Sequence, residues 1–600
     1  MTAGAVLKQY FGYDGFRAGQ ETVIDAIMDG RDCLGIMPTG AGKSLCFQVP
    51  ALMMQGIVIV VSPLISLMKD QVNALTQAGV PAAFINSSLT ERQVGKALAN
   101  AERGAYKLIY VAPERLHTYD FMEFAANADI AMVTVDEAHC ISQWGQDFRP
   151  GYLEIPAFIR ALKKRPVVSA FTATATPRVK EDIVRRLMLD EPLVLVSGFD
   201  RPNLFFDVKS PKDKFSALLF FLEEKTNSSG IVYGTTRATV EEVADKLNKN
   251  GYKAARYHAG LSDGERNKNQ EDFLFDRVQI MVATNAFGMG IDKSNVAFVV
   301  HYNMPKDMES YYQEAGRAGR DGEKADCLLL YSKGDVSTNT WLIHNAAEAT
   351  DETKQANMQK LYETEMYCTT KNCLREYILR YFGESPQEKC EGCANCNTAF
   401  EETDITLEVQ KIISCIIRMK ERFGENMIFD VLKGKKNKKI MNFGLDRLPT
   451  FGISNLGAAF QREVMDYLLL NQYIHKTTGE FPIIKLKEKA REALKKDTVI
   501  FMKTATTKDK KQKNRIHTES RKSVDNDLLS KLKEARLVIA RNQNMPAFTI
   551  FHDSTLLDMC AKQPFNKETL LDVSGVGNVK AEKYGDIFLE IINEHIKRSE

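Results

Sequence analysis

Two glycines, a lysine and a serine within MPTGAGKS have the types and spacing needed to hold a polyphosphate. Glycine lets backbone N–H groups approach phosphate oxygens, and a helix after this turn would point the positive end of its dipole at them. Lys43 can pair with the β- and γ-phosphates, and the Ser44 hydroxyl can ligate Mg²⁺. Met37 stands where the general pattern has glycine, so an ordinary glycine-rich turn is the alternative. The residues expected to contact the phosphates are Thr39, Gly40, Gly42, Lys43 and Ser44.

An acidic pair, Asp136 and Glu137, directly follows the apolar run Ile130–Val135. The carboxyl end of a strand is where parallel sheets bind ligands. Asp136 can therefore reach the Mg²⁺ ion, and Glu137 can orient or deprotonate an attacking water. Such a pair is often only a solvated turn, but its place downstream of GAGKS favours phosphoryl chemistry.

Four of the eleven cysteines have the spacing of a metal site. Cys373 is followed after sixteen residues by Cys390, and Cys393 and Cys396 continue at CxxC spacing. Four thiolates can close a tetrahedral zinc site, which is structural because no position stays open for water. An iron–sulfur cluster and a redox disulfide are the alternatives. Cys368 lies close by but outside the pattern.

The elements that must position these residues follow an α/β rhythm. GIVIVVSPL, YKLIYVAPE and IAMVTVDEA are apolar, β-branched runs separated by helical stretches, which is typical of a parallel sheet. A second unit of this kind begins near Asp207 and has no phosphate loop. With 600 residues, 44% of them hydrophobic, the chain has room for several domains.

Charge and hydropathy limit the remaining classes of protein. The net charge of +2 excludes no partner, because 80 basic and 78 acidic residues can be segregated into patches. No run reaches the roughly 18 apolar residues of a membrane span, and the amino terminus lacks a signal-peptide layout. We therefore expect a cytoplasmic protein that does not bind membranes.

Six motifs resemble, in order, those of superfamily 2 helicases, and of the RecQ DNA helicases in particular. They are FGYDGFRAGQ, MPTGAGKS, DEAH, FTATAT, VATNAFGMGID and QEAGRAGRDG, and they occur within the first 322 residues. The resemblance implies two RecA-like domains that close on one ATP with Mg²⁺. In that family a Met at position 37 is unremarkable.

The resemblance assigns roles to single residues. Arg317 and Arg320 are expected to enter from the second domain and stabilise charge on the γ-phosphoryl group. His139, Thr172 and Thr174 are expected to couple the nucleotide state to DNA binding. The expected adenine contacts are Tyr13, Arg17 and Gln20, although a helix with an exposed glutamine is the plainer interpretation of that segment. The expected DNA backbone contacts are Arg237, His258 and Thr284; GTTR departs from the usual Ser-Arg ending, so Arg237 fits the motif least well.

An aromatic and polar loop, CISQWGQDFRPGY, follows DEAH directly. Aromatic faces stack on bases at roughly 1–3 kcal/mol each, and arginine adds a phosphate contact. In RecQ enzymes the matching loop senses single-stranded DNA beside the ATPase site; core packing of Trp144 and Phe148 is the alternative. The residues involved are Trp144, Phe148, Arg149 and Tyr152.

From about Asp404 to Leu494 the sequence predicts helices and a terminal β-hairpin, which resembles a winged-helix domain. Its loop LKGKKNKK suits a duplex backbone, with Lys435 and Lys438 as the leading candidates and a solvated surface as the alternative. The lysines of this run are Lys433, Lys435, Lys436, Lys438 and Lys439.

Beyond Met502–Lys522, a polar and basic stretch predicted to be a disordered linker, Leu528–Ile596 resembles a helical HRDC domain. Its GVG turn can hold a phosphate; a tether or protein-contact module is the alternative. The expected boundaries are 1–206 and 207–340 for the motor domains, 341–402 for the zinc subdomain, 403–498 for the winged helix, 499–523 for the linker and 524–600 for the HRDC-like domain.

Three functions are compatible with these patterns. The first is a DNA helicase that translocates 3′ to 5′, a polarity implied only by the resemblance; the others are an RNA helicase and a non-enzymatic nucleic-acid scaffold. The expected partners are single-stranded and forked duplex DNA. The resemblance also implies action as a monomer at the nucleoid, in repair and recombination, with single-stranded DNA-binding protein docking on the winged helix.

Overall fold

The computed structural model describes residues 1–600 except 39, 143, 146, 226–227, 289–292, 347–349, 385–389, 391, 399, 478–481, 496–497, 506–525, 544 and 600. Thr39, predicted to contact phosphate, and most of the predicted linker therefore lie outside the described residues. Among the helices that are described, none is long and apolar enough to cross a lipid bilayer.

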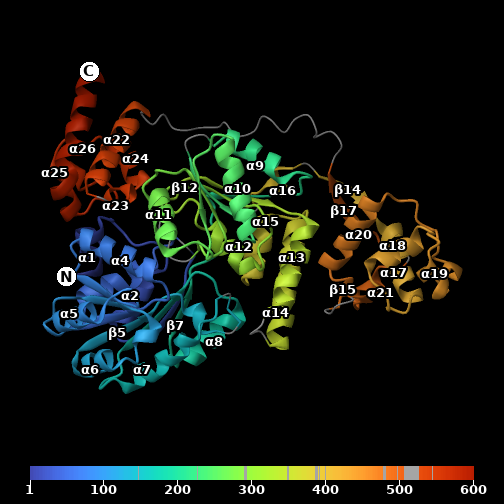
Figure 1. Ribbon diagram of the computed structural model, residues 1–600, viewed down its shortest axis with the longest axis horizontal. Coiled ribbons are helices and arrows are strands. Elements are labelled where there is room, and N and C mark those ends of the chain that lie inside the picture. The colour runs from blue at the N-terminus through green and yellow to red at the C-terminus, as the bar shows by residue number, and fades with distance from the viewer. Residues whose placement is uncertain are drawn as a thin grey trace.

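The first lobe is built on a parallel sheet of seven described strands, in the order β3-β4-β2-β5-β6-β1-β7 (Figure 1). Alternate residues of β2 face two separate hydrophobic clusters, so both faces of the sheet are buried, as its unbroken apolar runs predict. The strands are β1 Cys33–Ile36, β2 Ile57–Val61, β3 Ala82–Ile85, β4 Leu108–Val111, β5 Ile130–Val135, β6 Val167–Thr172 and β7 Leu193–Val196. The helices are α1 Ala3–Val6, α2 Gln20–Met28, α3 Leu45–Met53, α4 Ile65–Gln77, α5 Glu91–Glu102, α6 Tyr119–Asn127, α7 Ile155–Ala161 and α8 Pro177–Leu187.

The second lobe repeats this construction with a parallel sheet in the order β10-β11-β9-β12-β13-β8. It begins at Leu204, slightly before the expected boundary at 207, because β8 pairs along β13. The strands are β8 Leu204–Lys209, β9 Ser229–Tyr233, β10 Ala254–Tyr257, β11 Ile280–Ala283, β12 Val296–His301 and β13 Ala325–Leu330. The helices are α9 Lys214–Glu223, α10 Arg237–Lys249, α11 Asp263–Leu274 and α12 Met308–Ala315. Together the two sheets form the predicted pair of RecA-like α/β domains.

A helical subdomain and a winged-helix domain follow on one side of the second lobe (Figure 1). The hairpin β15–β16 that the sequence predicts is present and antiparallel. The helices of the subdomain are α13 Lys333–His344, α14 Asp351–Thr369, α15 Leu374–Tyr381 and α16 Ala394–Asn397. The winged-helix elements are β14 Phe400–Asp404, α17 Thr406–Arg418, α18 Glu425–Leu432, α19 Lys438–Asn442, α20 Ala458–Leu470, β15 Ile474–Lys476, β16 Ile484–Leu486, α21 Lys489–Glu492 and β17 Phe501–Ala505.

The start of the predicted linker is wrong. The sequence predicts a linker over residues 499–523, disordered from Met502, but β17 pairs antiparallel with β14 from Phe501 to Ala505. The buried side chains of Ile500 and Met502 join the winged-helix core, so this strand belongs to that domain.

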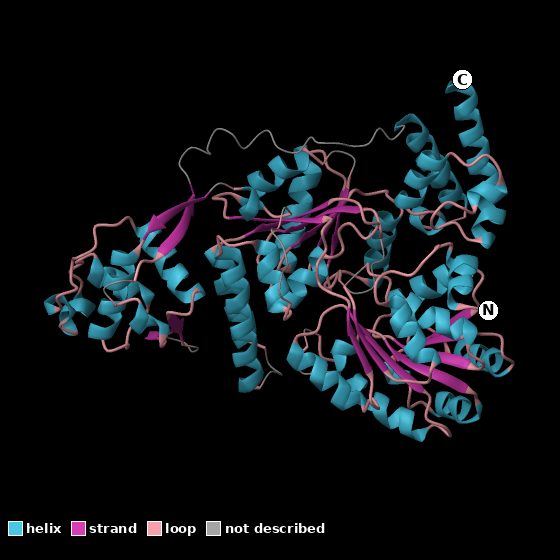
Figure 2. Cartoon of the chain, turned by 180° about the vertical axis from the view of Figure 1, so that it is seen from behind, coloured by secondary structure: helices cyan, strands magenta, loops and turns pink. Residues whose placement is uncertain are grey.

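The carboxyl-terminal helices form a separate bundle at the opposite end of the molecule from the winged helix (Figures 1 and 2). The bundle lies against the first lobe: the N–H of Gly575 donates to the carbonyl of Gly12 at 3.0 Å, and Lys583 Nζ donates to Gln77 Oε1 at 3.0 Å. The predicted phosphate contact of the GVG turn therefore does not hold at Gly575, whose N–H is bonded to protein. The helices are α22 Asn526–Asn542, α23 Ala547–Ile550, α24 Asp553–Lys562, α25 Lys567–Leu570 and α26 Asn578–Ser599.

Candidate functional site

The predicted phosphate loop joins β1 to α3, as expected for a strand, turn and helix. Gly40 and Gly42 have φ angles of +84° and +80°, a region that favours glycine. Lys43 lies close enough to the DEAH carboxyls for its charge to act on the pKa values of Asp136 and Glu137. The loop thus brings its lysine to the carboxyl end of the sheet, where β5 ends.

The predicted adenine-binding residues contact the phosphate loop directly. The buried Gln20 donates through Nε2 to the carbonyls of Ala41 at 3.1 Å and Gly42 at 3.0 Å, and its Oε1 accepts from the N–H of Arg17. Arg17 in turn donates to the carbonyl of Gly40. Gln20 thus supports the backbone of the loop, a role that the sequence did not reveal. Its adenine contact, like those of Tyr13 and Arg17, stays a prediction.

The acidic pair lies directly after β5, at the carboxyl end of that strand. Burial raises the pKa of Asp136, and the neighbouring Glu137 adds to this shift. Burial alone would also raise the pKa of Glu137, but the charge of Lys43 and then the contact with His139 outweigh it and lower that pKa. Carboxylate and hydroxyl oxygens are ligands that Mg²⁺ accepts, so the chemistry of Asp136 and Ser44 suits the predicted metal role, which stays a prediction.

His139 connects the acidic pair to FTATAT. Its Nδ1 lies 2.8 Å from Thr172 Oγ1 at the end of β6 and 3.3 Å from Glu137 Oε2. The Thr172 hydroxyl donates to the carbonyl of Thr174 at 3.2 Å. A displacement of the FTATAT segment would therefore be transmitted to the residue beside the acidic pair, as expected for a coupling element.

Of the two arginines of QEAGRAGRDG, Arg320 approaches the phosphate loop from the second lobe. A cavity of about 300 Å³ separates the lobes. A β carbon placed on Gly40 would lie 3.6 Å from the Cα of Arg320, which shows how closely the two loops approach. Arg317 is buried, and after Lys43 and His139 its charge also lowers the pKa of Glu137. The cavity is lined by residues that include Arg17, Gly40, Gly198, Arg201, Gly319 and Arg320.

The aromatic loop lies between the ATPase cleft and the zinc subdomain. The Trp144 ring is half-buried and stacks on Arg178, whose Cζ lies 3.3 Å from the ring centroid. The carbonyl of Trp144 accepts from Lys360 of α14 at 3.0 Å, and Lys360 also pairs with Glu309 of α12 at 3.0 Å. The loop is therefore linked to the helix that leads into the arginine loop.

Not every aromatic residue of this loop is available to DNA. Tyr152 is completely buried, and its hydroxyl donates to the carbonyl of Asp136 at 2.9 Å, so its placement with the stacking residues is wrong. Arg149 is bound to Asp147 at 2.9 Å and to the carbonyl of Pro63 at 2.8 Å. Phe148 is half-buried. The DNA contacts of Trp144, Phe148 and Arg149 stay predictions.

The three candidate DNA contacts of the second lobe lie at the carboxyl ends of neighbouring strands of its sheet. Arg237 begins α10 after β9, His258 follows β10, and Thr284 follows β11, and these strands are neighbours. The side chains of His258 and Thr284 are buried, whereas Arg237 is exposed. Direct contact with a phosphate is therefore easiest for Arg237, although its motif is the least typical.

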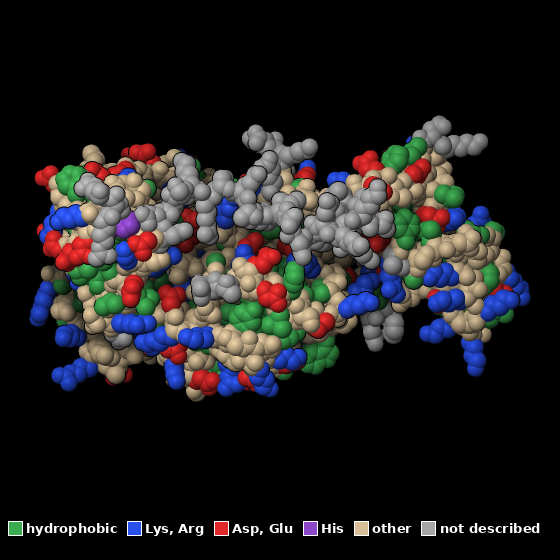
Figure 3. Space-filling view, turned by 90° about the horizontal axis from the view of Figure 1, so that it is seen from above, with side chains coloured by type: hydrophobic (Ala, Val, Ile, Leu, Met, Phe, Trp, Pro, Cys, Tyr) green, Lys and Arg blue, Asp and Glu red, His purple; other side chains and the backbone are tan. Residues whose placement is uncertain are grey.

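The lysine-rich run forms an exposed basic segment of the winged helix. Lys435 pairs with Asp430 at 2.8 Å while staying 61% exposed, and Lys438 begins the short helix α19. Figure 3 shows basic side chains gathered at the end of the molecule that this domain forms. The segment can therefore approach a polyanion without rearrangement of the core.

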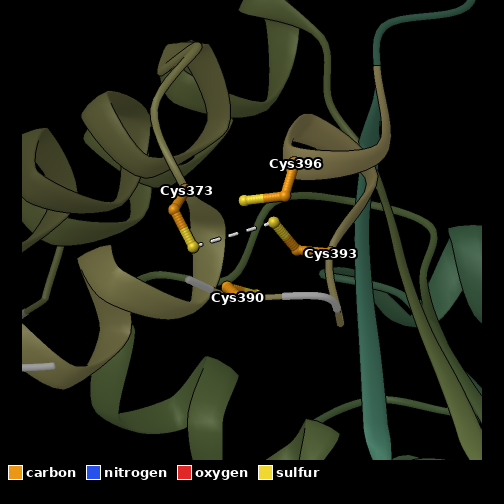
Figure 4. Close-up of side chains that lie close together, drawn as sticks. All are labelled: Cys373, Cys390, Cys393 and Cys396. Carbon is orange, nitrogen blue, oxygen red and sulfur yellow. Dashed lines mark hydrogen bonds between the residues drawn. The ribbon is translucent and has the colours of Figure 1, made fainter. Parts of the chain in front are cut away.

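The four predicted cysteines converge on one site (Figure 4). Their sulfur atoms all lie within 4.8 Å of one another, and the Sγ atoms of Cys373 and Cys393 are 3.9 Å apart. Sulfur atoms around tetrahedral zinc at ~2.3 Å would lie about 3.8 Å apart, so the geometry fits zinc. Cys373 caps the start of α15 and Cys393 that of α16, whereas Cys368 is buried in the main hydrophobic core. The ligands are Cys373, Cys390, Cys393 and Cys396.

Two further arginines, Arg201 and Arg375, link the zinc subdomain to the arginine loop. For Arg375 the sequence predicts only a basic helical stretch, Arg375–Phe382, that packs on the motor domains and can touch phosphates, and it gives no role to Arg201. Arg201, between the lobes, donates to carbonyls of the arginine loop, and Arg375 of α15 donates to the segment that contains Arg201. Neither belongs to a recognisable motif, and the bonds of Arg201 to the arginine loop and of Arg375 to the carbonyl of Arg201 each span more than 100 residues. The only available signal was the Arg-Pro-Asn triplet before an apolar run.

Comparisons with known proteins agree with this architecture along the whole chain. The sequence matches DEAD/DEAH box helicase over residues 17–183, the helicase conserved C-terminal domain over 213–322, RecQ zinc-binding over 333–397, the RQC domain over 399–511 and the HRDC domain over 525–592.

Among curated relatives, "ATP-dependent DNA helicase RecQ" of Bacillus subtilis is 42% identical over 100% of this chain and 99% of its own length. The protein of the same name from Pasteurella multocida is 38% identical over 99% of this chain and 94% of its own. A mimivirus protein called "Putative ATP-dependent RNA helicase R290" is 36% identical over 80% of this chain and 90% of its own. The chain belongs to the RecQ family of ATP-dependent DNA helicases, and the four cysteines form its zinc site.

Proposed function

We propose that the chain hydrolyses ATP between its two lobes, with Mg²⁺ held by Ser44 and Asp136, and uses this turnover to move 3′ to 5′ along single-stranded DNA and separate duplex strands. The observation that carries the proposal is the approach of the arginine loop to the phosphate loop, with the Arg320 Cα 3.6 Å from a β carbon built on Gly40. Family membership supports the polarity and a role in repair and recombination.

Bound ATP with Mg²⁺ supplies the phosphoanhydride bond whose hydrolysis drives the cycle. Lys43 binds the β- and γ-phosphates, and Glu137 accepts a proton from the attacking water at its carboxylate. Arg317 and Arg320 place positive charge beside the transferred phosphoryl group. Tyr13, Arg17 and Gln20 bind the adenine, which requires the Gln20 amide to exchange its bonds to the loop.

Single-stranded DNA is proposed to cross both lobes. Trp144, Phe148 and Arg149 contact it on the first lobe, and Arg237, His258 and Thr284 line its path on the second. Lys435 and Lys438 bind the duplex backbone ahead of the fork. A monomer suffices for this arrangement, because every proposed contact comes from one chain; single-stranded DNA-binding protein is a proposed partner of the winged helix.

Phosphate release with and without single-stranded DNA tests this proposal. Wild type should be strongly stimulated by DNA, and Lys43→Ala should show no turnover while it binds DNA as wild type does. Lys96→Ala, an exposed lysine of α5, is the matched control and should behave as wild type. DNA-stimulated turnover in Lys43→Ala would refute the assignment, and stimulation by RNA but not by DNA would favour an RNA helicase.

A further inference from the structure

We propose that Arg375 of the zinc subdomain is a positioning residue for ATP hydrolysis. It holds the interlobe segment 200–204, and Arg201 of that segment holds the loop that carries Arg317 and Arg320. The proposal rests on the proposed roles of these two arginines at the γ-phosphate.

Arg375 fixes the interlobe segment at three points. The residue lies in the first turn of α15 and is 7% exposed. Its Nη1 donates to Asp200 Oδ1 at 2.5 Å and to the carbonyl of Arg201 at 2.7 Å, and its Nη2 donates to the carbonyl of Leu204 at 2.6 Å. Because the guanidinium is a planar fork, these bonds fix the direction of the segment as well as its position.

The loop that carries Cys390 and Cys393, here called the zinc loop, also contacts Arg375. Gly392 lies between two zinc ligands: its N–H donates to Cys390 Sγ at 3.3 Å, and its carbonyl accepts from Arg375 Nη2 at 3.4 Å. The same carbonyl accepts from the N–H of Phe206, in β8, at 3.1 Å. A β carbon on Gly392 would collide with the Arg375 guanidinium. The folded zinc loop therefore determines where this guanidinium lies.

Arg201 passes this constraint to the arginine loop. Its guanidinium donates to the carbonyls of Gly316 at 3.4 Å, Ala318 at 3.1 Å and Gly319 at 2.9 Å. Asn203 donates to the same Gly319 carbonyl at 2.9 Å. These carbonyls flank Arg317 and immediately precede Arg320.

Arg375 reaches the arginine loop through Arg201. Its loss should therefore affect ATP turnover and not only the zinc site. A displacement of about 1 Å in a catalytic group can cost on the order of 100-fold in rate. Loss of the Arg375 contacts would leave the lysine, glycines and adenine-binding residues of the first lobe untouched. The expected defect is therefore in kcat, with ATP binding largely kept.

Arg375→Gln tests the inference in the full-length zinc-loaded protein, with DNA-stimulated ATPase as the readout. We expect kcat to fall about 10- to 100-fold with KM for ATP changed less than about threefold, and with zinc content and DNA affinity as in wild type. Arg380→Gln is the matched control, because this arginine lies on the same helix, is exposed and contacts Glu376. It should leave kcat unchanged.

A double-mutant cycle with Arg320→Ala separates positioning from general support. If Arg375 acts through the arginine loop, adding Arg375→Gln to Arg320→Ala should lower kcat by less than about twofold further. The inference would be overturned if kcat of the double variant fell by the same further factor as in Arg375→Gln alone. A defect of Arg375→Gln confined to KM, or loss of its zinc, would also overturn it. Should Arg375→Gln be insoluble, Arg201→Lys replaces it in the same cycle with the same expected results. A wild type without DNA-stimulated ATPase would instead refute the proposed function itself.

Discussion

At the scale of single residues, contacts between motifs connect the loop that we propose senses DNA with the acidic pair of the proposed ATPase site. Trp144 stacks on Arg178, which lies near the start of α8 shortly after FTATAT, and Thr172 of FTATAT binds His139 beside the acidic pair. A cation over an aromatic ring contributes about 0.5–2 kcal/mol, enough to set the conformation of a loop. DNA that stacks on Trp144 would therefore release Arg178. This would disturb the contacts that run from FTATAT through His139 to Glu137.

Trp144→Ala should weaken the stimulation of ATPase by single-stranded DNA more than it weakens basal hydrolysis. The substitution removes both the stacking face and the partner of Arg178, but it leaves Lys43 and the acidic pair in place. The measurement is the ratio of DNA-stimulated to basal turnover at saturating ATP. Tyr119→Ala, an aromatic residue of the same lobe that is 79% exposed, is the control. Equal loss of both activities would assign Trp144 to the core.

The residues whose positions the sequence could indicate lie within motifs whose spacing is local. The four cysteines form the zinc site that their spacing predicts, and Lys43 and the acidic pair occupy the expected turns at strand ends, while their catalytic roles stay predictions. Arg178, Lys360 and Arg201 could not be placed, because their partners are distant in sequence and a single arginine or lysine has no periodic signal. Gln20 was placed in the cleft, but its bonds to the phosphate loop depend on the packing of α2 against α3.

At the scale of elements, the zinc site joins α15, which packs into the main hydrophobic core, to the short helix α16. Two of its ligands cap α15 and α16, and α16 has no buried residue. For α16, metal binding therefore stands in for hydrophobic burial as the source of local folding free energy. Because Phe206 of β8 also bonds to the zinc loop, the site anchors the subdomain to the second lobe.

Cys393→Ala should yield protein that lacks zinc and is sensitive to protease, because removal of one ligand leaves an incomplete site. Cys368→Ala should keep about one zinc per chain and lose only about 1 kcal/mol in the free energy of unfolding, since it removes one buried sulfur from the core. Metal analysis and limited proteolysis make the comparison. Full zinc content in Cys393→Ala would show that the ligands are misassigned. Iron and sulfide in the wild-type protein would show that the site holds an iron–sulfur cluster and not zinc.

Strands with unbroken apolar runs were predictable, whereas elements fixed by distant partners were not. The strands β2, β4 and β5 follow from β-branched sequence alone. By contrast, β17 is not predicted, because most of it belongs to the stretch Met502–Lys522, which is polar and basic as a whole. The strand forms by pairing with β14, about a hundred residues earlier.

At the scale of the whole molecule, the carboxyl-terminal bundle contacts both lobes next to the adenine motif. Besides the bond from Gly575 to Gly12, Lys8 Nζ donates to the carbonyl of Leu571 at 2.6 Å, and His552 Nδ1 lies 3.0 Å from Ser294 Oγ of the second lobe. Gly12 has a φ of +74°, and a β carbon there would lie 2.6 Å from the backbone N of Gly577. The contact therefore requires glycine at position 12.

Gly12→Ala should loosen the bundle from the first lobe without unfolding either part. The added methyl group collides with the 576–577 backbone, so amide hydrogen exchange should become faster around Gly575 while the core of the bundle keeps its protection. Gly15→Ala is the control, because a β carbon there meets no atom within 4 Å. Unchanged exchange at Gly575 in Gly12→Ala would contradict the docking.

The central claim is that ATP turnover between the lobes drives strand separation of DNA, and strand displacement on matched substrates tests it most directly. The account predicts ATP-dependent unwinding of a DNA duplex with a 3′ single-stranded tail, much weaker activity on the same duplex with a 5′ tail or made of RNA, and no unwinding by Lys43→Ala. Unwinding that persists in Lys43→Ala, or that occurs on the RNA duplex but not on DNA, would contradict it.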